Sequence, residues 1–319
     1  MGNPEFDPTR LSPDVLAVLE TASKTGMPPM ETLAIGDMRE AYRQIGVLLG
    51  GEPVPVAKSV DLAARGPAGD IPLRLYLPAV PKNVSPATIY FHGGGWCIGG
   101  IDTHDKVCRR LAHESGHPIV SVEYRLAPEH PAPAGPDDAV AATRWIYDHA
   151  GELGLDASRL AVAGDSAGGS LSAVVTQQLR SIVPLVAQIL FYPCTDLSPA
   201  SSRYPSRSEN ANVPPLTLAA MHAMADPFAG ELINDPRVSP LCGKDLQDLP
   251  PALIFTGECD VLRDDGRFYA DALKKAGVPV EHIELPGMVH GFIEMAGVLP
   301  AARQTFERAG AFLRSRFVA

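Results

Sequence analysis

The sequence predicts an α/β fold with a mostly parallel, eight-stranded sheet and helices on both faces. Eight short apolar or β-branched runs occur along the 319 residues, and longer stretches with helical periodicity separate most of the later ones. Such alternation of strands and helices gives a parallel sheet. The middle runs are almost entirely apolar, as strands buried on both faces must be. No period of 20–50 residues repeats, which excludes solenoids and propellers.

The expected elements follow one another in a simple order. We expect strands over residues 54–62, 71–80, 87–91, 119–124, 160–163, 185–192, 252–256 and 280–285. We expect helices over residues 103–113, 137–151, 167–180, 263–276 and 301–316. The first two strands have no helix between them, so they should form an antiparallel hairpin at one edge of the sheet. The last strand, if it lies at an exposed edge, could pair across a homodimer.

Two regions interrupt the alternation. Residues 11–47 have the pattern of two amphipathic helices without a strand, and residues 197–235 contain polar turns followed by a helix near 216–225. Both could fold together as a helical lid over the carboxyl edge of the sheet. Alternatively, the first is a surface arm and the second a long loop. Their length favours the lid, because structureless loops above ~15 residues are uncommon in compact domains.

The composition argues against several classes of protein. The net charge is −10, and no block of lysine and arginine is present, so neither a nucleic acid nor an anionic membrane is expected as a partner. No apolar run approaches the ~18–20 residues of a membrane span, and the first ten residues lack the apolar core of a signal peptide. The five cysteines are an odd number without C-x-x-C spacing, which argues against a disulfide framework or a zinc ribbon. We therefore expect a cytoplasmic protein with buried free thiols.

The segment 160–169 predicts a nucleophilic serine. An apolar strand leads into Gly164-Asp-Ser166-Ala-Gly168, and a helix of small residues follows. At such a turn the serine backbone is strained, and the two glycines avoid clashes with neighbouring chains. The hydroxyl then projects from the sheet edge at a helix N-terminus, which favours developing negative charge. A glycine-rich turn whose serine only caps the helix is the alternative, but the flanking strand and helix favour the nucleophile.

Three consecutive glycines follow the third expected strand, in His92-Gly-Gly-Gly95-Trp96. Their amides have no side-chain cover, and together with the amide of Ala167 they could hold an oxyanion, at ~3–4 kcal/mol per donor in favourable cases. A flexible hairpin tip is the alternative. Phosphate binding is not expected, because neither G-x-G-x-x-G nor G-x-x-x-x-G-K-[ST] can be read in the chain. We expect His92 to anchor the loop rather than act as a base.

A general base and an acid should follow late strands, at the same sheet edge as the serine. Among the nine histidines, His290 follows the last expected strand, whereas His282 lies within it and the others precede or flank earlier helices. The acid should end the preceding strand, where Asp260 is the first choice and Glu258 and Asp264 are alternatives. Asp260 could instead be a helix N-cap, and His290 a surface-loop residue. Their joint order and their placement at strand ends favour the catalytic interpretation.

Residues 113–117 match a zinc-binding motif, but the residues around them argue against a zinc site. His113-Glu-Ser-Gly-His117 matches the zinc motif H-E-x-x-H, which needs both histidines on one face of one helix. Gly116 and Pro118 flank the second histidine, and both oppose continuation of a helix. We therefore expect a helix end leading into a strand, not a zinc site.

Taken together, these motifs resemble the hormone-sensitive lipase family of α/β-hydrolases, and within it the bacterial esterases. The order serine, acid, histidine is also the order in α/β-hydrolases. The matching segments extend from about residue 70 to residue 300. They are His92-Gly-Gly-Gly-Trp96, Tyr124-Arg-Leu-Ala-Pro-Glu-His-Pro131, Pro136-Asp-Asp138, Gly164-Asp-Ser-Ala-Gly168, Asp260-Val-Leu-Arg-Asp264 and His290-Gly-Phe292.

The resemblance implies an α/β-hydrolase fold and a serine carboxylesterase that acts through an acyl-enzyme intermediate. It implies Ser166 as the nucleophile, His290 as the base and Asp260 as the orienting acid. The implied oxyanion donors are Gly94, Gly95 and Ala167. No metal or organic cofactor is implied. We expect the substrate to be a small-molecule ester with a short or medium acyl chain, because a cap narrows the pocket.

The resemblance also implies a division of the chain into a cap and a catalytic core. Residues 1–50 and the insertion 197–235 would form the helical cap, and residues 51–196 and 236–319 the core. Three alternatives to the esterase stay open. A lipase on longer acyl chains and an amidase or deacylase would use the same three side chains. A receptor with this fold that binds without turnover should lack one of them, and all three are present.

Overall fold

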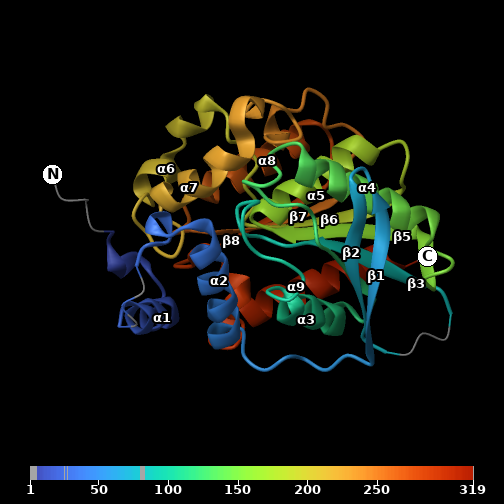
Figure 1. Ribbon diagram of the computed structural model, residues 1–319, viewed down its shortest axis with the longest axis horizontal. Coiled ribbons are helices and arrows are strands. Elements are labelled where there is room, and N and C mark those ends of the chain that lie inside the picture. The colour runs from blue at the N-terminus through green and yellow to red at the C-terminus, as the bar shows by residue number, and fades with distance from the viewer. Residues whose placement is uncertain (1–5, 25, 27, 80–82, 319) are drawn as a thin grey trace.

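Eight strands form one sheet in the order β1-β2-β4-β3-β5-β6-β7-β8 (Figure 1). The computed structural model describes residues 6–24, 26, 28–79 and 83–318, so half of the polar first ten residues lies outside it. The strands are β1 (Lys58–Gly66), β2 (Gly69–Leu77), β3 (Ser85–Phe91), β4 (Ile119–Val122), β5 (Leu155–Asp165), β6 (Leu185–Phe191), β7 (Ala252–Gly257) and β8 (Val280–Leu285). All pairings from β4 through β8 are parallel, whereas β2 runs antiparallel to both β1 and β4. The mostly parallel sheet and the hairpin at its edge are thus confirmed.

Two strands, β1 and β5, differ from the sequence prediction by four residues or more at one end. The first was expected over residues 54–62, but β1 begins at Lys58 and pairs with β2 down to the turn at Gly66. Pro55 has no amide hydrogen for the ladder, and the pairing with β2 rather than apolar character sets the strand limits. Similarly, β5 begins at Leu155, five residues earlier than expected, because Leu155 still pairs with Ser85 of β3 before the register shifts to Leu160 opposite Ala87. Residue 80, the expected end of the second strand, lies outside the described residues.

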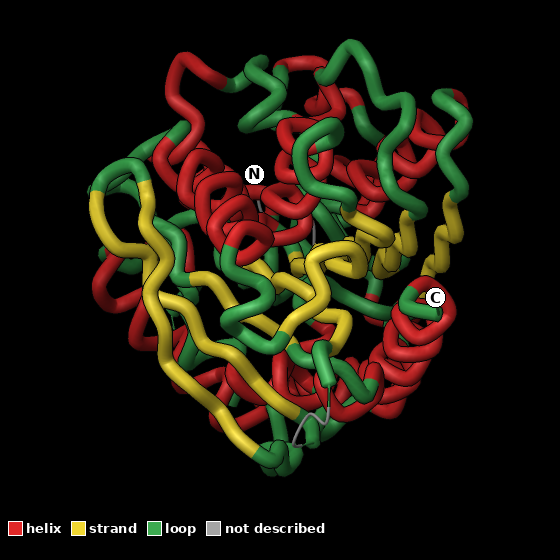
Figure 2. Tube along the Cα trace, turned by 90° about the vertical axis from the view of Figure 1, so that its right-hand side faces the viewer, coloured by secondary structure: helices red, strands yellow, loops and turns green. Residues whose placement is uncertain are grey.

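Helices cover both faces of the sheet (Figures 1 and 2), as expected. The helices are α1 (Pro13–Ser23), α2 (Ile35–Leu49), α3 (Asp105–Ser115), α4 (Ala134–Asp148), α5 (Ala167–Leu179), α6 (Pro205–Glu209), α7 (Leu218–Ala229), α8 (Arg263–Lys275) and α9 (Pro300–Arg316). Helices α3 and α9 lie on one face of the sheet, and α4, α5 and α8 lie on the other. Within the described ranges, no helix combines the length and apolar character that a membrane span requires.

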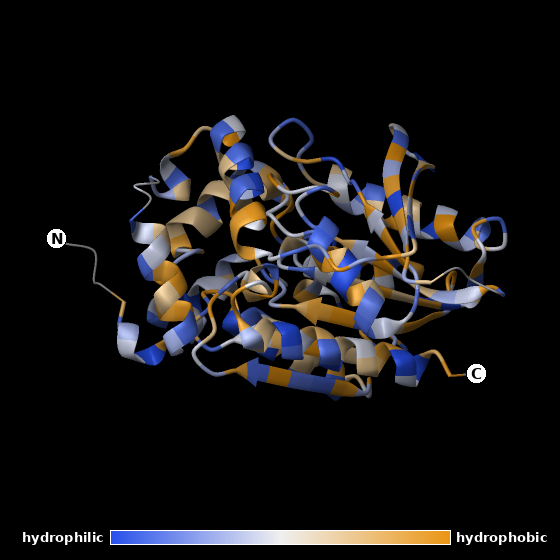
Figure 3. Ribbon diagram, turned by 90° about the horizontal axis from the view of Figure 1, so that it is seen from below, coloured by the Kyte–Doolittle hydropathy of each residue, from blue (hydrophilic) through white to orange (hydrophobic). Residues whose placement is uncertain are grey.

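Apolar side chains fill the space on both faces of the sheet. Successive residues of a strand point to opposite faces, so Phe91 packs with the layer of α4 and α5, whereas Tyr90 packs with α3 and α9. The inner strands are accordingly mostly apolar, as the orange ribbons in Figure 3 show. The two-sided burial leaves the ends of the strands as the places where polar side chains can gather.

The remaining helices lie together at one end of the sheet (Figure 1). Residues 11–47 contain α1 and much of α2, and residues 197–235 contain α6 and α7, which follow β6. The side chain of Ser12 caps α1, and that of Thr217 caps α7 by accepting a hydrogen bond from the amide of Ala220. These four helices therefore stand over the strand ends that the sequence identified as the candidate site.

Candidate active site

Ser166 lies at the sharp turn between β5 and α5. Its backbone has φ 53° and ψ −119°, a strained conformation that non-glycine residues rarely adopt. The amide of Ser166 donates to the carbonyl of Phe191 on β6, which fixes the turn against the neighbouring strand. At Gly168 an added Cβ would overlap the carbonyl oxygen of Phe91. The close approach of β3 is thus possible only because this residue has no side chain.

The structure brings together the three side chains that the sequence singled out. The Oγ of Ser166 lies 2.9 Å from Nε2 of His290, and Nδ1 of His290 lies 2.8 Å from Oδ2 of Asp260. Ser166 follows β5, Asp260 follows β7 and His290 follows β8, so the parallel strands deliver all three to one edge. The other oxygen of Asp260 accepts the amide of Leu262 at 2.8 Å. This carboxylate is therefore fixed on both sides.

The alternative acids and the alternative histidine have other partners. Glu258 accepts the amide of Gly287 at 2.9 Å. Asp264 forms an ion pair with Arg263 at 3.0 Å. His282 remains within β8, where Nε2 lies 2.9 Å from the hydroxyl of Thr256. Among the described residues, none of these three forms a hydrogen bond or ion pair with Ser166 or His290.

The surroundings of His290 favour its charged form. Burial disfavours the imidazolium, but the adjacent Asp260 carboxylate outweighs burial, and the pKa of His290 lies above its ordinary value. A raised pKa makes His290 a stronger acceptor for the Ser166 proton, as a general base requires. The ring also lies against Tyr192, with centroids 4.7 Å apart, which restricts its orientation.

The three-glycine loop lies directly beside the serine. Gly94 and Gly95 border the same cavity as Ser166 and His290. Ala167 is the first residue of α5, so its amide is one of those at a helix N-terminus without an intrahelical acceptor. His92 is stacked on Tyr124 at 4.2 Å, and burial together with the neighbouring His104 lowers the pKa of His92 to about 3. A neutral, stacked histidine fits the predicted anchor.

A buried polar network behind the serine was missed in the sequence analysis. Asp165 is fully buried and accepts hydrogen bonds from the hydroxyl of Tyr90 at 2.6 Å and from the amide of Gly93 at 3.0 Å. His104 lies 3.3 Å from the same carboxylate. Burial opposes a charge on His104, but Asp165 outweighs it and raises the pKa to about 9. Asp165 thus joins the turn at Ser166 to the three-glycine loop through the Gly93 amide, and to His104 through an ion pair.

This network is also the one group of potential metal ligands among the described residues. Nitrogen or oxygen atoms of His104, Asp165 and Glu294 lie within 4.8 Å of one another. Because Asp165 already accepts two hydrogen bonds and faces His104, we interpret the group as an internally bonded polar cluster. The predicted helix end at the H-E-x-x-H motif is observed, since α3 ends at Ser115. His117 lies beyond the helix, where its ring packs edge-on against Phe317.

Hydrogen bonds also tie α2, α7 and Asn210 to the loops around Ser166 and His290. The thiol of Cys97, beside the oxyanion loop, donates to the carbonyl of Met224 on α7 at 3.2 Å. Nε of Arg39 on α2 donates to the carbonyl of Cys97 at 2.8 Å. From the insertion, Nδ2 of Asn210 donates to the carbonyl of Asp260 at 2.8 Å. Sequence patterns give no signal for these contacts, because each joins residues more than 45 positions apart.

Ser166 opens into a cavity of about 180 Å³. The walls are largely apolar and come from α1, α2 and α7 as well as from the strand ends. They include Val18 and Leu19 of α1, Ile45 of α2 and Met224 of α7. The site therefore combines a hydrogen-bonded hydroxyl, a neighbouring glycine-rich loop and an apolar enclosure of small-molecule size.

Comparisons with known proteins agree with this geometry. A family model described as alpha/beta hydrolase fold matches residues 88–294. Esterase LipI of Mycobacterium tuberculosis is 45% identical over 290 residues, which cover 88% of this chain and 90% of that protein. Ethyl acetate hydrolase of Pseudomonas putida is 36% identical over 304 residues, covering 92% and 95%. The structure of a hyperthermophilic esterase from the archaeon Pyrobaculum calidifontis superposes with a TM-score of 0.91 at 36% identity, covering 97% of this chain and 99% of that one.

Proposed function

Because this chain belongs to the α/β-hydrolase family, among the bacterial esterases similar to hormone-sensitive lipase, we propose that Ser166, His290 and Asp260 are its catalytic residues. The chain is a carboxylic ester hydrolase. The observation that carries the proposed roles is the continuous hydrogen-bonded chain of Oγ, Nε2, Nδ1 and Oδ2, with links of 2.9 and 2.8 Å. Such a chain is what a serine nucleophile, its base and the orienting acid require.

The first half of the reaction acylates the enzyme. The Oγ of Ser166 bonds to the ester carbonyl carbon while its proton passes to Nε2 of His290. The carbonyl oxygen becomes an oxyanion, which the amides of Gly94, Gly95 and Ala167 hold. Collapse of this intermediate breaks the bond to the alcohol oxygen, and His290 gives its proton to the leaving alcohol. No redox change occurs, and the acyl group remains on the serine.

The second half returns the enzyme to its starting state. A water molecule gives a proton to His290 and attacks the acyl carbon, the same amides hold the second oxyanion, and the carboxylic acid leaves as Ser166 regains its proton. Asp260 keeps Nδ1 protonated, so that Nε2 is the acceptor in both halves. It also stabilises the imidazolium that forms in each.

We expect short- to medium-chain esters as substrates, since the cavity of about 180 Å³ admits only a small apolar group. Residues 1–50 and 197–235 would act as a cap, because α1, α2 and α7 supply much of the cavity wall. The edge strand β8 would be the surface for a homodimer. All five cysteines are free, which fits the cytoplasm as the proposed compartment.

The test is Ser166→Ala on p-nitrophenyl butyrate. The expected loss of kcat is about 10⁴-fold or more, because the variant has no nucleophile. Ser172→Ala is the matched control: this buried serine lies on the same helix, donates to the carbonyl of Gly168 and should be dispensable for turnover. Rapid labelling of the wild type, but not of Ser166→Ala, by a fluorophosphonate would identify the reactive hydroxyl. Retained turnover by Ser166→Ala would remove this residue from the chemistry.

A further inference from the structure

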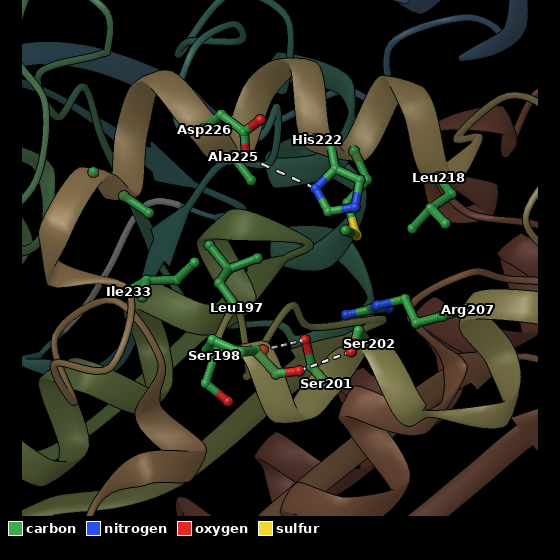
Figure 4. A pocket seen from close by; sticks show the side chains of 14 residues that line it. Leu197, Ser198, Ser201, Ser202, Arg207, Leu218, His222, Ala225, Asp226 and Ile233 are labelled. Carbon is green, nitrogen blue, oxygen red and sulfur yellow. Dashed lines mark hydrogen bonds and ion pairs between the residues drawn. The ribbon is translucent and has the colours of Figure 1, made fainter.

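A second cavity, of about 440 Å³, borders helix α7 (Figure 4). It lies on the other side of this helix from the cavity that Ser166 and His290 border, which is called the catalytic cavity below. It is enclosed between α7 and the segment that follows β6, which contributes Leu197, Ser198 and Ser202. Figure 4 shows that the side chains of His222 and Ala225 extend from α7 toward this segment. None of the proposed catalytic residues borders it, so the mechanism leaves this cavity unused.

One row of side chains separates the two cavities. Met221 and Ala225, one helical turn apart on α7, border both cavities. On one side of this row, Ala220 and Met224 border the catalytic cavity alone. The partition is therefore only one side chain thick. Methionine is the unbranched side chain that most readily adopts another rotamer, so the partition has a movable part.

The second cavity is lined by both apolar and polar side chains. Its buried apolar members are Leu197, Met221 and Ala229, and its buried polar members are Ser198, Ser201 and Arg207. At the surface, His222 and Asp226 are exposed and face each other at 3.8 Å. The apolar members offer a surface to an aliphatic chain that enters from the catalytic side.

A charged ligand is less well matched to this cavity. The buried guanidinium of Arg207, which borders it, already donates to the carbonyl of Val261 and pairs with Asp265 at 2.8 Å. Because Asp265 balances the cation, the cavity has no unpaired buried charge at this residue to hold an anion. The remaining attraction for a ligand is apolar burial against the inner wall.

We propose that the second cavity receives the distal aliphatic segment of medium-chain esters whose chain extends beyond the catalytic cavity, and that the Met221 side chain moves aside to admit it. The inference rests on the proposed function, because the ester group must be held at Ser166 while the chain passes over α7. Each methylene buried in the second cavity should raise kcat/KM about fourfold, since burying one CH₂ in an apolar environment changes an equilibrium by that factor.

The test fills the second cavity from its outer wall. Ser202 is exposed, borders only this cavity and donates its hydroxyl to the carbonyl of Pro199, so Ser202→Trp places a large ring there without touching the catalytic cavity. Ser208→Trp is the matched control, because Ser208 is equally an exposed serine that donates three residues back, to Pro205, and it borders neither cavity. Two substrate series are compared: p-nitrophenyl esters from acetate to decanoate, and acetates of alcohols of the same lengths.

Ser202→Trp should keep wild-type kcat/KM on p-nitrophenyl acetate and lose activity on the longer members of one series. If two methylenes lose their burial, the ratio of octanoate to butyrate falls about 15-fold. The series that responds identifies whether the acyl chain or the alcohol chain enters. Met221→Ala should raise the same ratio, because the partition is then open. Unchanged ratios in both series for Ser202→Trp would overturn the proposal while activity on acetate still upheld the ester hydrolase.

Discussion

Replacement of Asp165 by asparagine tests whether the buried ion pair behind the nucleophile stabilises the fold. In the structure each ring nitrogen of His104 has an acceptor within hydrogen-bond distance. Nε2 lies 3.3 Å from Asp165, with the amide of Gly93 also at 3.3 Å. Nδ1 lies 2.9 Å from the hydroxyl oxygen of Thr103, whose own hydrogen is donated to the carbonyl of Gly100. Asparagine keeps the shape of Asp165 but removes the charge that holds the His104 proton.

The size of the effect follows from the pKa of His104, which Asp165 raises from 6.5 to about 9 against the opposing effect of burial. A shift of this size corresponds to about 3 kcal/mol of preference for the imidazolium in the folded state. Because the folded-state pKa is the higher one, the stabilisation is fully present below pH 6.5 and is lost as the pH rises through about 9. Between pH 7 and pH 9.5 the free energy of unfolding of the wild type should therefore fall by about 2 kcal/mol. Asp165→Asn lacks this ion pair, so its free energy of unfolding should not show that fall.

The assay is urea unfolding of the wild type and of Asp165→Asn across this pH range. We expect the variant to be about 3 kcal/mol less stable at pH 7, with the gap narrowing by about 2 kcal/mol at pH 9.5. Asp70→Asn, which removes an exposed carboxylate from β2, controls for the change in net charge. A gap that stays constant with pH would refute the ion pair as its source, and so would equal stability at pH 7.

Two further predictions concern the base and the nucleophile turn. The rising limb of kcat/KM against pH should lie above pH 6.5, because Asp260 outweighs burial and raises the pKa of His290. Asp260→Asn should move that limb to lower pH as kcat falls, and a limb that stays in place would contradict this coupling. Gly168→Ala should cost about 2–3 kcal/mol in thermal unfolding, because its Cβ would overlap Phe91. Gly151→Ala is the control, because an added Cβ there has no atom within 4 Å, and its effect on stability should be close to zero. Equal losses of stability in the two variants would contradict the predicted overlap at Gly168.

The catalytic geometry could be predicted from the sequence because it depends on strand order. A residue that follows a parallel strand must appear at the carboxyl edge, so three strand ends were enough to predict that Ser166, Asp260 and His290 lie together. Their catalytic roles stay a prediction. The ion pair of His104 with Asp165 could not be found this way. Its partners are 61 positions apart. His104 has no strand-end position to distinguish it from the other histidines.

The limits of β1 and the second cavity escaped prediction for related reasons. The hydrogen-bond ladder with β2 defines β1 as far as Gly66, and an edge strand half exposed to water carries only a weak apolar pattern. The second cavity depends on which face of α7 packs against residues 197–202, and the helix is apolar and small on several sides. Periodicity can locate such a helix, but it does not tell which of its rows becomes a partition.

The contacts of the helical segments indicate which positions can change substrate range without disturbing the chemistry. Arg39 donates to the carbonyl of Cys97 and Asn210 to that of Asp260, so in the proposed mechanism replacing either would loosen a group that must be held for the transition state. Met221 and Ser202 make no such bond to either loop among the interactions recorded for the described residues. Their side chains only line cavities: Met221 borders both cavities and Ser202 the second one. Variation at these two positions should therefore alter the selectivity between esters, whereas variation at Arg39 or Asn210 should lower kcat for all of them.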